Sequence, residues 1–136
     1  MNILVDTDVL IDVALDREPF SRDSCALLDR LEQRPGIGFV AWPSLSNFYY
    51  LVAPGTGKTT ARGFLVDLLR FVHVAPTTTA SFMTAAGLEK TDLEDAMQVA
   101  AALAAKAEAI ATRNVADFAR SPIPALPPAD VLDRLR

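Results

Sequence analysis

Short apolar runs alternate with helical segments along the whole chain, and this alternation constrains the fold more than any other feature. The first apolar run ends near Asp6, and a helical pattern follows it through Ala14. Further apolar runs of strand length fall in residues 37–42, 72–74 and 109–114, with a very short one near 125–126. Strands that alternate with helices imply a parallel sheet covered on both faces. We therefore predict an α/β fold, a three-layer α/β/α sandwich around a central, mostly parallel sheet.

Proline, glycine and capping residues mark the ends of the expected helices. Pro35-Gly36 stops one helical pattern, and the next opens at Pro43 and Ser44 and ends at Pro54-Gly55. The alanine-rich stretch 93–107 is the strongest helix signal, with Thr91 or Asp92 as its cap. After the first helix, the expected helices cover residues 24–34, 44–53, 59–71, 78–86 and 93–107, with a terminal helix after Pro127-Pro128.

Length and composition favour one domain spanning residues 1–136. The chain is 51% hydrophobic, which supplies enough apolar surface for one core. No uninterrupted apolar run approaches the roughly 20 residues that cross a bilayer, so we expect no membrane association. Asp6 and Asp8 lie where a signal peptide would need an apolar stretch, and the single Cys25 agrees with a reducing compartment. These features predict a cytoplasmic protein.

The charge and the few nucleophilic side chains limit the chemistry that is expected. A net charge of −4 argues against a broad, sequence-independent grip on nucleic acid, but it does not exclude nucleic acid as a substrate. Cys25 and the only histidine, His73, are interpreted as structural residues. The segment APGTGKTT resembles the end of a phosphate-binding loop, but Val52 stands where the first glycine belongs and a helix precedes it. We read residues 54–57 as a turn and expect no nucleotide cofactor.

Acidic residues fall where the predicted strands lead into helices. Asp6 ends the first strand, Asp92 and Asp95 begin the long helix, and Asp117 follows the strand that contains Thr112. In open parallel sheets the ligand site lies beyond the carboxyl ends of the strands, so all four carboxylates can reach one end of the sheet. Carboxylates that converge without Lys or Arg between them require a hard cation such as Mg²⁺ or Mn²⁺. The pattern is compatible with metal-assisted phosphodiester hydrolysis.

Simpler interpretations of the same residues stay open at this point. Asp6 and Asp8 can cap the helix that follows them, and Asp92 can cap its own helix. Asp117 can bond within its turn, where aspartate is common. Spacing alone does not choose between these local roles and a shared metal site.

Four segments, taken in order, resemble the signatures of PIN domains: ILVDTDVLIDVAL, PSLSNFYYLV, DLEDAMQ and TRNVADF. The resemblance covers nearly the whole chain and implies a PIN-like fold that binds Mg²⁺ or Mn²⁺ and cleaves RNA. It implies metal binding by Asp6, Asp95 and Asp117, with Asn114 at the T-x-N/D position. Thr112 corresponds to a hydroxyl residue beside the site.

The sequence is most similar to the VapC-like branch, whose members are ribonuclease toxins held inactive by an antitoxin and are usually dimeric. The resemblance therefore implies an RNA substrate, an antitoxin partner and a homodimer. Many members carry a glutamate where this chain has Asn47, whose amide oxygen can bind a metal but adds no charge. We hypothesise that Asp92, one helical turn before Asp95, supplies the missing charge.

Basic and aromatic residues near the expected site admit two interpretations each. The side chains of Arg17, Lys90, Arg113 and Arg120 can contact RNA phosphates or simply solvate the surface. The aromatic residues Phe48, Tyr49 and Tyr50 can stack on bases, but packing in the core or in a dimer is favoured. The alternative function to a nuclease is a catalytically weak module that binds RNA or a partner protein.

Overall fold

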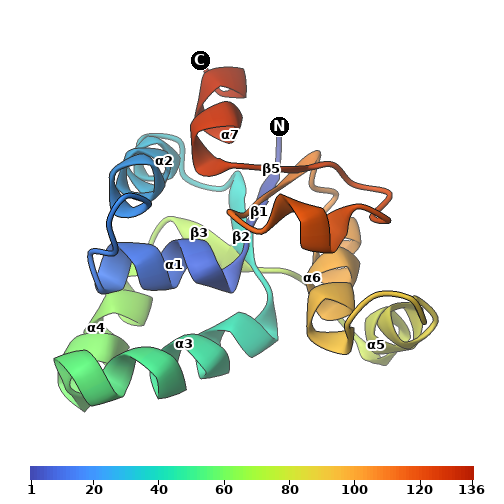
Figure 1. The fold of residues 1–136 in the computed structure, drawn as a ribbon, viewed down its shortest axis with the longest axis horizontal. Helices are drawn as coiled ribbons and strands as arrows, with labels where there is room; N and C mark the ends of the chain where they lie inside the picture. Colours follow the sequence, from blue (N-terminus) through green and yellow to red (C-terminus); the bar gives the residue numbers. More distant parts are fainter.

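The computed structural model describes residues 1–136 and contains one five-stranded parallel sheet. The strand order is β3-β2-β1-β4-β5, so β1 lies in the middle (Figure 1). The strands are short and cover β1 Ile3–Val5, β2 Gly38–Val40, β3 Val72–Val74, β4 Ala109–Ala111 and β5 Ala125–Leu126. Every recorded pairing is parallel, which makes the predicted mostly parallel sheet a fully parallel one.

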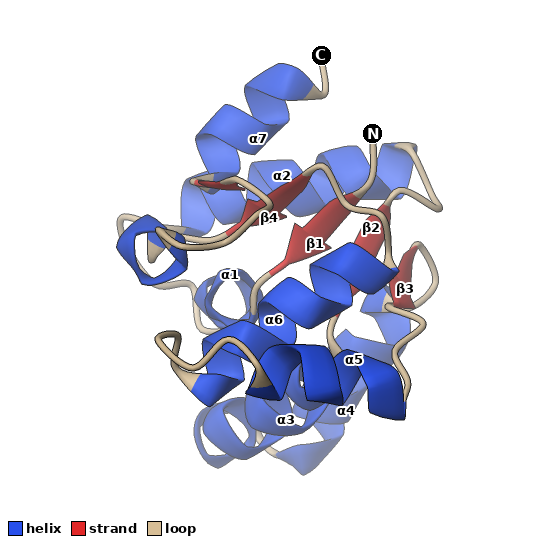
Figure 2. Ribbon diagram, turned by 90° about the vertical axis from the view of Figure 1, so that its right-hand side faces the viewer, coloured by secondary structure: helices blue, strands red, loops and turns tan.

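Seven α-helices and one 3-10 helix, η1, surround this sheet. They are α1 Thr7–Ala14, α2 Ser21–Gln33, α3 Trp42–Thr56, α4 Lys58–Leu68, α5 Thr79–Ala86, α6 Leu93–Ala104, η1 Val115–Phe118 and α7 Pro128–Arg134. Helices α5 and α6 cover one face of the sheet, and α1, α2 and α7 pack on the other (Figures 1 and 2). The predicted three-layer α/β/α sandwich is confirmed.

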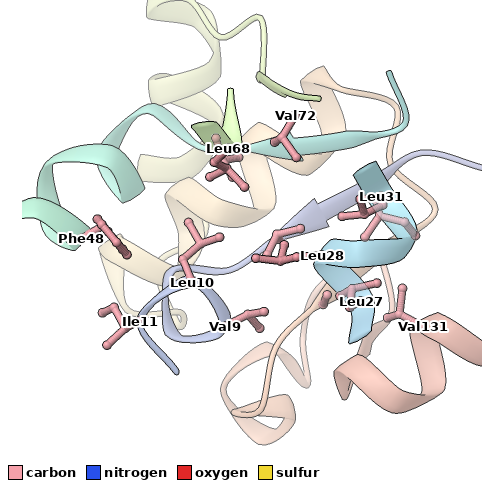
Figure 3. Close-up of a cluster of buried hydrophobic side chains, with 14 of the residues drawn as sticks. Val9, Leu10, Ile11, Leu27, Leu28, Leu31, Phe48, Leu68, Val72 and Val131 are labelled. Atoms are coloured by element: carbon pink, nitrogen blue, oxygen red, sulfur yellow. The ribbon is translucent and has the colours of Figure 1, made fainter. Parts of the chain in front are cut away.

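The two sheet faces bury different kinds of side chain. Ile3 and Val5 point into a cluster of large aliphatic residues contributed by helices α1, α2, α3, α4 and α7 (Figure 3). Leu4 points the other way, into a cluster in which six of the eleven buried residues are alanines, with Val99, Ala101 and Ala102 contributed by α6. This alternation is the two-residue period expected of a strand buried on both faces. Helix α6 therefore packs on the sheet mainly through small side chains. On the opposite face, leucines and valines lie between the helices and the sheet.

The sheet topology places one pair of strand ends beside the entrance to two helices. The chain adds β2 and β3 on one side of β1 and then returns to add β4 and β5 on its other side. The strand order therefore reverses direction at β1. Val5 and Ala111 are paired, and the Asp6 amide donates to the carbonyl of Ala111 at 2.9 Å. The carboxyl ends of β1 and β4 therefore open into the same space, which is where open α/β sheets bind ligands.

Several helix boundaries differ from the sequence prediction. Helix α2 starts at Ser21 instead of residue 24, α4 ends at Leu68 instead of residue 71, and α6 ends at Ala104 instead of residue 107. Helix α3 starts at Trp42 and continues to Thr56, so Pro54 lies inside it and the expected end at Pro54-Gly55 is wrong. Proline removes one helical hydrogen bond, but Gly57 still donates to Ala53 at 2.8 Å and closes the last turn. The predicted turn over residues 54–57 is reduced to Gly57, whose φ of 94° links α3 directly to α4.

Other boundaries agree more closely with the prediction. The residues that begin α5 and α6 are capped by Thr78 and Asp92, the second being one of the two predicted caps. The segment around His73 forms the predicted short strand, and His73 is exposed there. No helix has the length and apolar character needed to cross a bilayer.

Candidate functional site

An acidic cavity of about 200 Å³ lies at the carboxyl end of β1. Residues from α1, α3, α6 and the turn after β4 form its walls, and no Lys or Arg is among them. The lining residues are Asp6, Thr7, Asp8, Ile11, Asn47, Leu51, Glu94, Asp95, Gln98 and Asn114. Two larger cavities, of about 370 and 380 Å³, lie elsewhere, and neither contains a residue predicted for the site. We call the smaller one the acidic pocket.

Asp6 both caps helix α1 and lines the acidic pocket. One carboxylate oxygen accepts from the amide of Thr7 at 2.8 Å, and the other accepts from the hydroxyl of Thr112 at 2.9 Å. Thr112 is fully buried and Asp6 is 8% exposed. The capping interpretation and the site interpretation of Asp6 are therefore compatible, because the helix end fixes the carboxylate where the pocket begins.

Asp8 is a second carboxylate of the pocket that sequence reasoning had treated only as a cap. Its Oδ2 atom lies 3.2 Å from the Thr112 hydroxyl and accepts from the Asn114 side chain at 2.9 Å and the Arg113 amide at 3.3 Å. Its Oδ1 atom is buried and has no hydrogen-bond partner. A buried carboxylate oxygen without a donor is costly, which marks this point of the pocket as one that needs a ligand.

Burial and mutual repulsion raise the pKa values of the pocket carboxylates. Burial, together with the charge of Asp8, raises the pKa of Asp6 to about 7, although the hydrogen bond from Thr112 lowers it. Burial also raises the pKa of Asp8. Burial raises the pKa of Asp95 to about 6, with further contributions from neighbouring carboxylates, first of all Asp117. The pocket therefore resists accumulating negative charge in the absence of a cation.

Asp92 and Asp95 play different parts at the start of α6. The Asp92 carboxylate accepts from the amides of Glu94 and Asp95 at 3.1 and 3.3 Å, which is the predicted capping role. Asp92 does not line the pocket, although its charge contributes to the raised pKa of Asp95. Asp95 lines the pocket directly. Glu94, which immediately precedes Asp95, also lines the pocket and accepts from the Asn47 side chain.

The remaining predicted residues lie on the turn after β4. Asn114 lines the pocket, and its side chain is bound to Asp8. Asp117 is exposed on η1 and does not line the pocket, but its charge is the largest electrostatic influence on Asp95. The structure thus brings Asp6, Asn47, Asp95 and Asn114 together, with Thr112 behind Asp6 and with Asp92 and Asp117 outside the lining.

A buried polar chain supports the pocket from below. Thr7 donates to the hydroxyl oxygen of Ser44 at 2.7 Å, and Gln98 donates to the same oxygen at 2.8 Å. Gln98 is 2% exposed, and its Oε1 atom has no hydrogen-bond partner. The sequence held a signal for Gln98, because it follows Asp95 by one helical turn and so shares its helix face.

Arg113 is bound to a buried aspartate on α1. Its Nε atom lies 2.7 Å from Oδ2 of Asp12, whose side chain is fully buried. The guanidinium also lies 4.5 Å from the ring centroid of Phe20, a cation–π contact. Arg17 approaches Asp12 more distantly, at 3.9 Å. Arg113 therefore anchors the turn after β4 to α1, and this contact competes with the predicted contact to RNA phosphates.

The donor set of the pocket fits a hard divalent cation chemically. Carboxylate and amide oxygens are the ligands that Mg²⁺ and Mn²⁺ prefer, and the unpartnered Oδ1 of Asp8 is available to bind one. No three His, Cys, Asp or Glu side chains are close enough together to form an all-protein cage. Mg²⁺ does not require such a cage, because it usually keeps several waters and binds through one or two carboxylates.

The comparisons with known proteins agree with this geometry. The PIN domain family matches the sequence over residues 2–116, whereas no curated protein matches it. VapBC2 from Rickettsia felis, solved with a promoter DNA fragment, is similar in fold with a TM-score of 0.71 and 15% identity. That match covers 93% of this chain and 98% of the other.

Two further solved structures share the fold. VapBC-1 from nontypeable Haemophilus influenzae has a TM-score of 0.70 and 14% identity, over 94% of this chain and 98% of the other. Mycobacterium tuberculosis VapC20, described as a toxin that cleaves the sarcin-ricin loop, has a TM-score of 0.69 and 15% identity. That match covers 88% of this chain and 95% of the VapC20 chain. With the sequence match spanning most of its length, the chain belongs to the PIN domain family.

Proposed function

We propose that the protein is a Mg²⁺- or Mn²⁺-dependent endoribonuclease that hydrolyses RNA phosphodiester bonds. The observation that carries the proposal is the acidic pocket, in which Asp6, Asp8 and Asp95 surround a cavity without any basic side chain. Membership of the PIN domain family and the position of the pocket at the carboxyl ends of β1 and β4 support it.

Asp6, Asp8 and Asp95 line the pocket and are the candidates for holding the cation, one or two of them directly and the others through water. A bound divalent cation lowers the pKa of water and stabilises the charge that develops on a phosphodiester during in-line attack. Thr112 and the amide of Thr7 fix the Asp6 carboxylate through hydrogen bonds to both of its oxygens. Asn114 and the Arg113 amide fix Asp8 through hydrogen bonds to Oδ2 alone, which leaves its Oδ1 atom without a partner. These contacts preorganise the oxygen ligands before any cation arrives.

The charge of the pocket controls how RNA can approach it. Four carboxylates line the cavity, and the nearby Arg113 is engaged with Asp12. A phosphodiester therefore meets electrostatic repulsion at the pocket until a cation offsets part of that charge. Binding of the scissile phosphate is expected to depend on the metal as strongly as cleavage does. Asp117 lies outside the lining, and we assign it a supporting electrostatic role on Asp95.

We further propose that this ribonuclease is the toxin of a toxin–antitoxin pair. Chains from two VapBC structures are among its structural neighbours, and the alignment covers 98% of each matched chain. An antitoxin partner, a homodimer, a single domain over residues 1–136 and a cytoplasmic location all follow from this assignment. Co-expression with the product of the adjacent gene, followed by size-exclusion chromatography, tests the partner and the oligomeric state together.

A catalytically weak RNA-binding or partner-binding module is the second candidate. It is favoured by two neutral residues in the lining, Asn47 and Asn114, and by the lack of any group of three acidic side chains at cage distance. Such a module would bind RNA or a partner protein and release no cleavage products.

Cleavage of structured and unstructured RNA by the purified protein separates the two candidates. The reaction is followed with Mg²⁺, Mn²⁺ or chelator, and wild type is compared with Asp95→Asn. Metal-dependent products that disappear in Asp95→Asn would establish the ribonuclease. RNA binding without cleavage under every metal condition would establish the weak module, and Asn47→Glu then tests whether an added carboxylate restores cutting.

A further inference from the structure

We infer that Asn47 and Glu94 act as one unit, in which the amide of Asn47 holds the Glu94 carboxylate at the rim of the acidic pocket as an additional cation-supporting group. This inference rests on the metal-dependent function proposed above. It assigns a role in cation binding to Glu94, which sequence reasoning did not select.

Glu94 lies in the first turn of α6, immediately before Asp95, and its side chain lines the same cavity as Asp6 and Asp8. It takes part in none of the four ion pairs of the structure. No basic side chain therefore neutralises its carboxylate. Its negative charge acts on the pocket instead, since it contributes to the raised pKa of Asp95.

The hydrogen bond from Asn47 restrains a side chain that would otherwise be mobile. Glu94 is exposed, and an exposed glutamate normally samples several rotamers. The Nδ2 atom of Asn47, on α3, donates to Oε1 of Glu94, on α6. This contact leaves Oε2 of Glu94 and Oδ1 of Asn47, two oxygen atoms of the kind that hard cations bind.

Gln98 gives an independent indication that the same side of the pocket receives a ligand. It lies one helical turn after Glu94 on α6, it is 2% exposed, and it lines the cavity. Its Nε2 atom donates a hydrogen bond to Ser44, and this bond sets the orientation of the whole amide group. The Oε1 atom of the same amide has no hydrogen-bond partner. Water molecules carried by a cation between Glu94 and Asp95 would supply the missing donor.

Asp92, the residue hypothesised from sequence for this role, is less suited to it. Its Oδ2 atom accepts from two backbone amides at the start of α6. Its side chain does not line the acidic pocket. Its influence on the site is therefore through longer-range charge, whereas Glu94 lines the cavity itself.

A charge exchange between positions 47 and 94 tests the unit directly. In E94Q the carboxylate is removed, and in N47E/E94Q the donor and acceptor of the same hydrogen bond are exchanged at constant net charge. E89Q is the matched control, because it removes one exposed carboxylate from the loop before α6 and does not touch the cavity. D92N tests the rival residue and keeps a good helix cap.

The measurement is Mn²⁺ affinity of the metal-free protein, from the electron paramagnetic resonance signal of free Mn²⁺, with RNA cleavage followed in parallel. We expect E94Q to weaken Mn²⁺ binding at least about tenfold, the scale for losing a group that supports a metal site. N47E/E94Q should recover most of that affinity, D92N should lose less than E94Q, and E89Q should bind as the wild type does. Thermal unfolding without metal checks that each variant is folded.

Unchanged affinity in folded E94Q, or an equal loss in D92N, would overturn the role of Glu94. A folded N47E/E94Q that binds as weakly as E94Q would overturn the claim that the two residues act as a unit. Wild type that binds Mn²⁺ but cuts no RNA would remove the nuclease proposal and leave the inference standing. Wild type that binds no Mn²⁺ would overturn both.

Discussion

The carboxylates of the acidic pocket fall into two pairs that are held very differently. Asp6 and Asp8, which we call the inner carboxylates, accept hydrogen bonds from backbone amides and from the buried Thr112. Glu94 and Asp95, the rim carboxylates, lie at the start of α6 and have one side-chain restraint, the contact from Asn47. The inner pair is part of the folded core, whereas the rim pair is placed by the end of a helix.

Because of this difference, substitutions in the two pairs are expected to affect the stability of the fold to different extents. Removing an inner carboxylate changes contacts that also hold β1, α1 and β4 together. Removing a rim carboxylate relieves repulsion and disturbs few other contacts. The comparison predicts that variants of the two pairs lose activity alike, but that only the inner variants also lose hydrogen bonds that join β1, α1 and β4.

The largest expected effect is loss of RNA cleavage in both pairs. Asp6→Asn and Asp95→Asn should each lower the cleavage rate by about 10²-fold or more, the scale for losing one group that stabilises transition-state charge. The rates are measured with Mn²⁺ in excess on one fluorescent RNA. Wild-type rates in Asp95→Asn would break the comparison, because the rim would then be dispensable for chemistry.

The next effect concerns the anchor behind the inner pair. Asp12→Ala should destabilise the protein by about 3 kcal/mol, because it leaves the partly buried Arg113 without its partner. The matched control is Asp67→Ala, which breaks the exposed pair with Arg70 and should cost less than about 1 kcal/mol. Urea denaturation gives both values. Equal losses would show that the buried pair does not anchor the inner side.

A smaller effect is expected from the hydroxyl that joins the inner carboxylates. Thr112→Val keeps the shape of the side chain and should destabilise the fold by about 1–2 kcal/mol, because a buried acceptor loses its donor. Loss of this bond should also raise the pKa of Asp6 further. Thr112→Ser, which retains the hydroxyl, is the control in thermal unfolding. A Val variant as stable as the Ser variant would contradict this role.

The smallest effect is a gain in stability at the rim. The pKa of Asp95 rises from 3.8 to about 6 on folding, so between these values the folded chain keeps a proton that the unfolded chain has released. Stability of the metal-free protein therefore falls as pH rises through this window, and for Asp6 the window extends to about pH 7. Asp95→Asn should unfold at a slightly higher temperature than wild type at pH 8.

The pH dependence sharpens the same comparison. At pH 4, where most of the shifted carboxylates are protonated, the stabilising effect of Asp95→Asn should disappear. Saturating Mn²⁺ at pH 8 should stabilise the wild type more than Asp95→Asn, since the cation offsets the repulsion that the substitution removes. A variant less stable than wild type at pH 8 without metal would contradict the assignment of Asp95 to a repulsive rim.

The sequence predicts the fold and one carboxylate of each pair, Asp6 of the inner pair and Asp95 of the rim pair. Alternating strands and helices predict the parallel sheet, and Asp6 and Asp95 fall at element ends where α/β proteins bind ligands. The missed contacts join residues far apart in the chain. Glu94 and Asn47 are separated by 47 positions and Arg113 and Asp12 by 101, so only the folded chain, which brings these side chains together at the pocket, reveals them. Local patterns favoured Asp92, which is occupied by capping.

The alanine-rich face of α6 has a consequence for how this site can change over evolution. Ala101 and Ala102 lie in the cluster on the sheet side, and Ala96 and Ala100 lie in the cluster that includes Ala85 of α5, so most of the buried contacts of the helix are made by small side chains. A larger side chain at any of them would push the helix outward and carry the attached acids away from β1. The spacing between the inner and rim carboxylates thus depends on alanines that do not line the acidic pocket, so a substitution there can change this spacing without replacing any acidic residue.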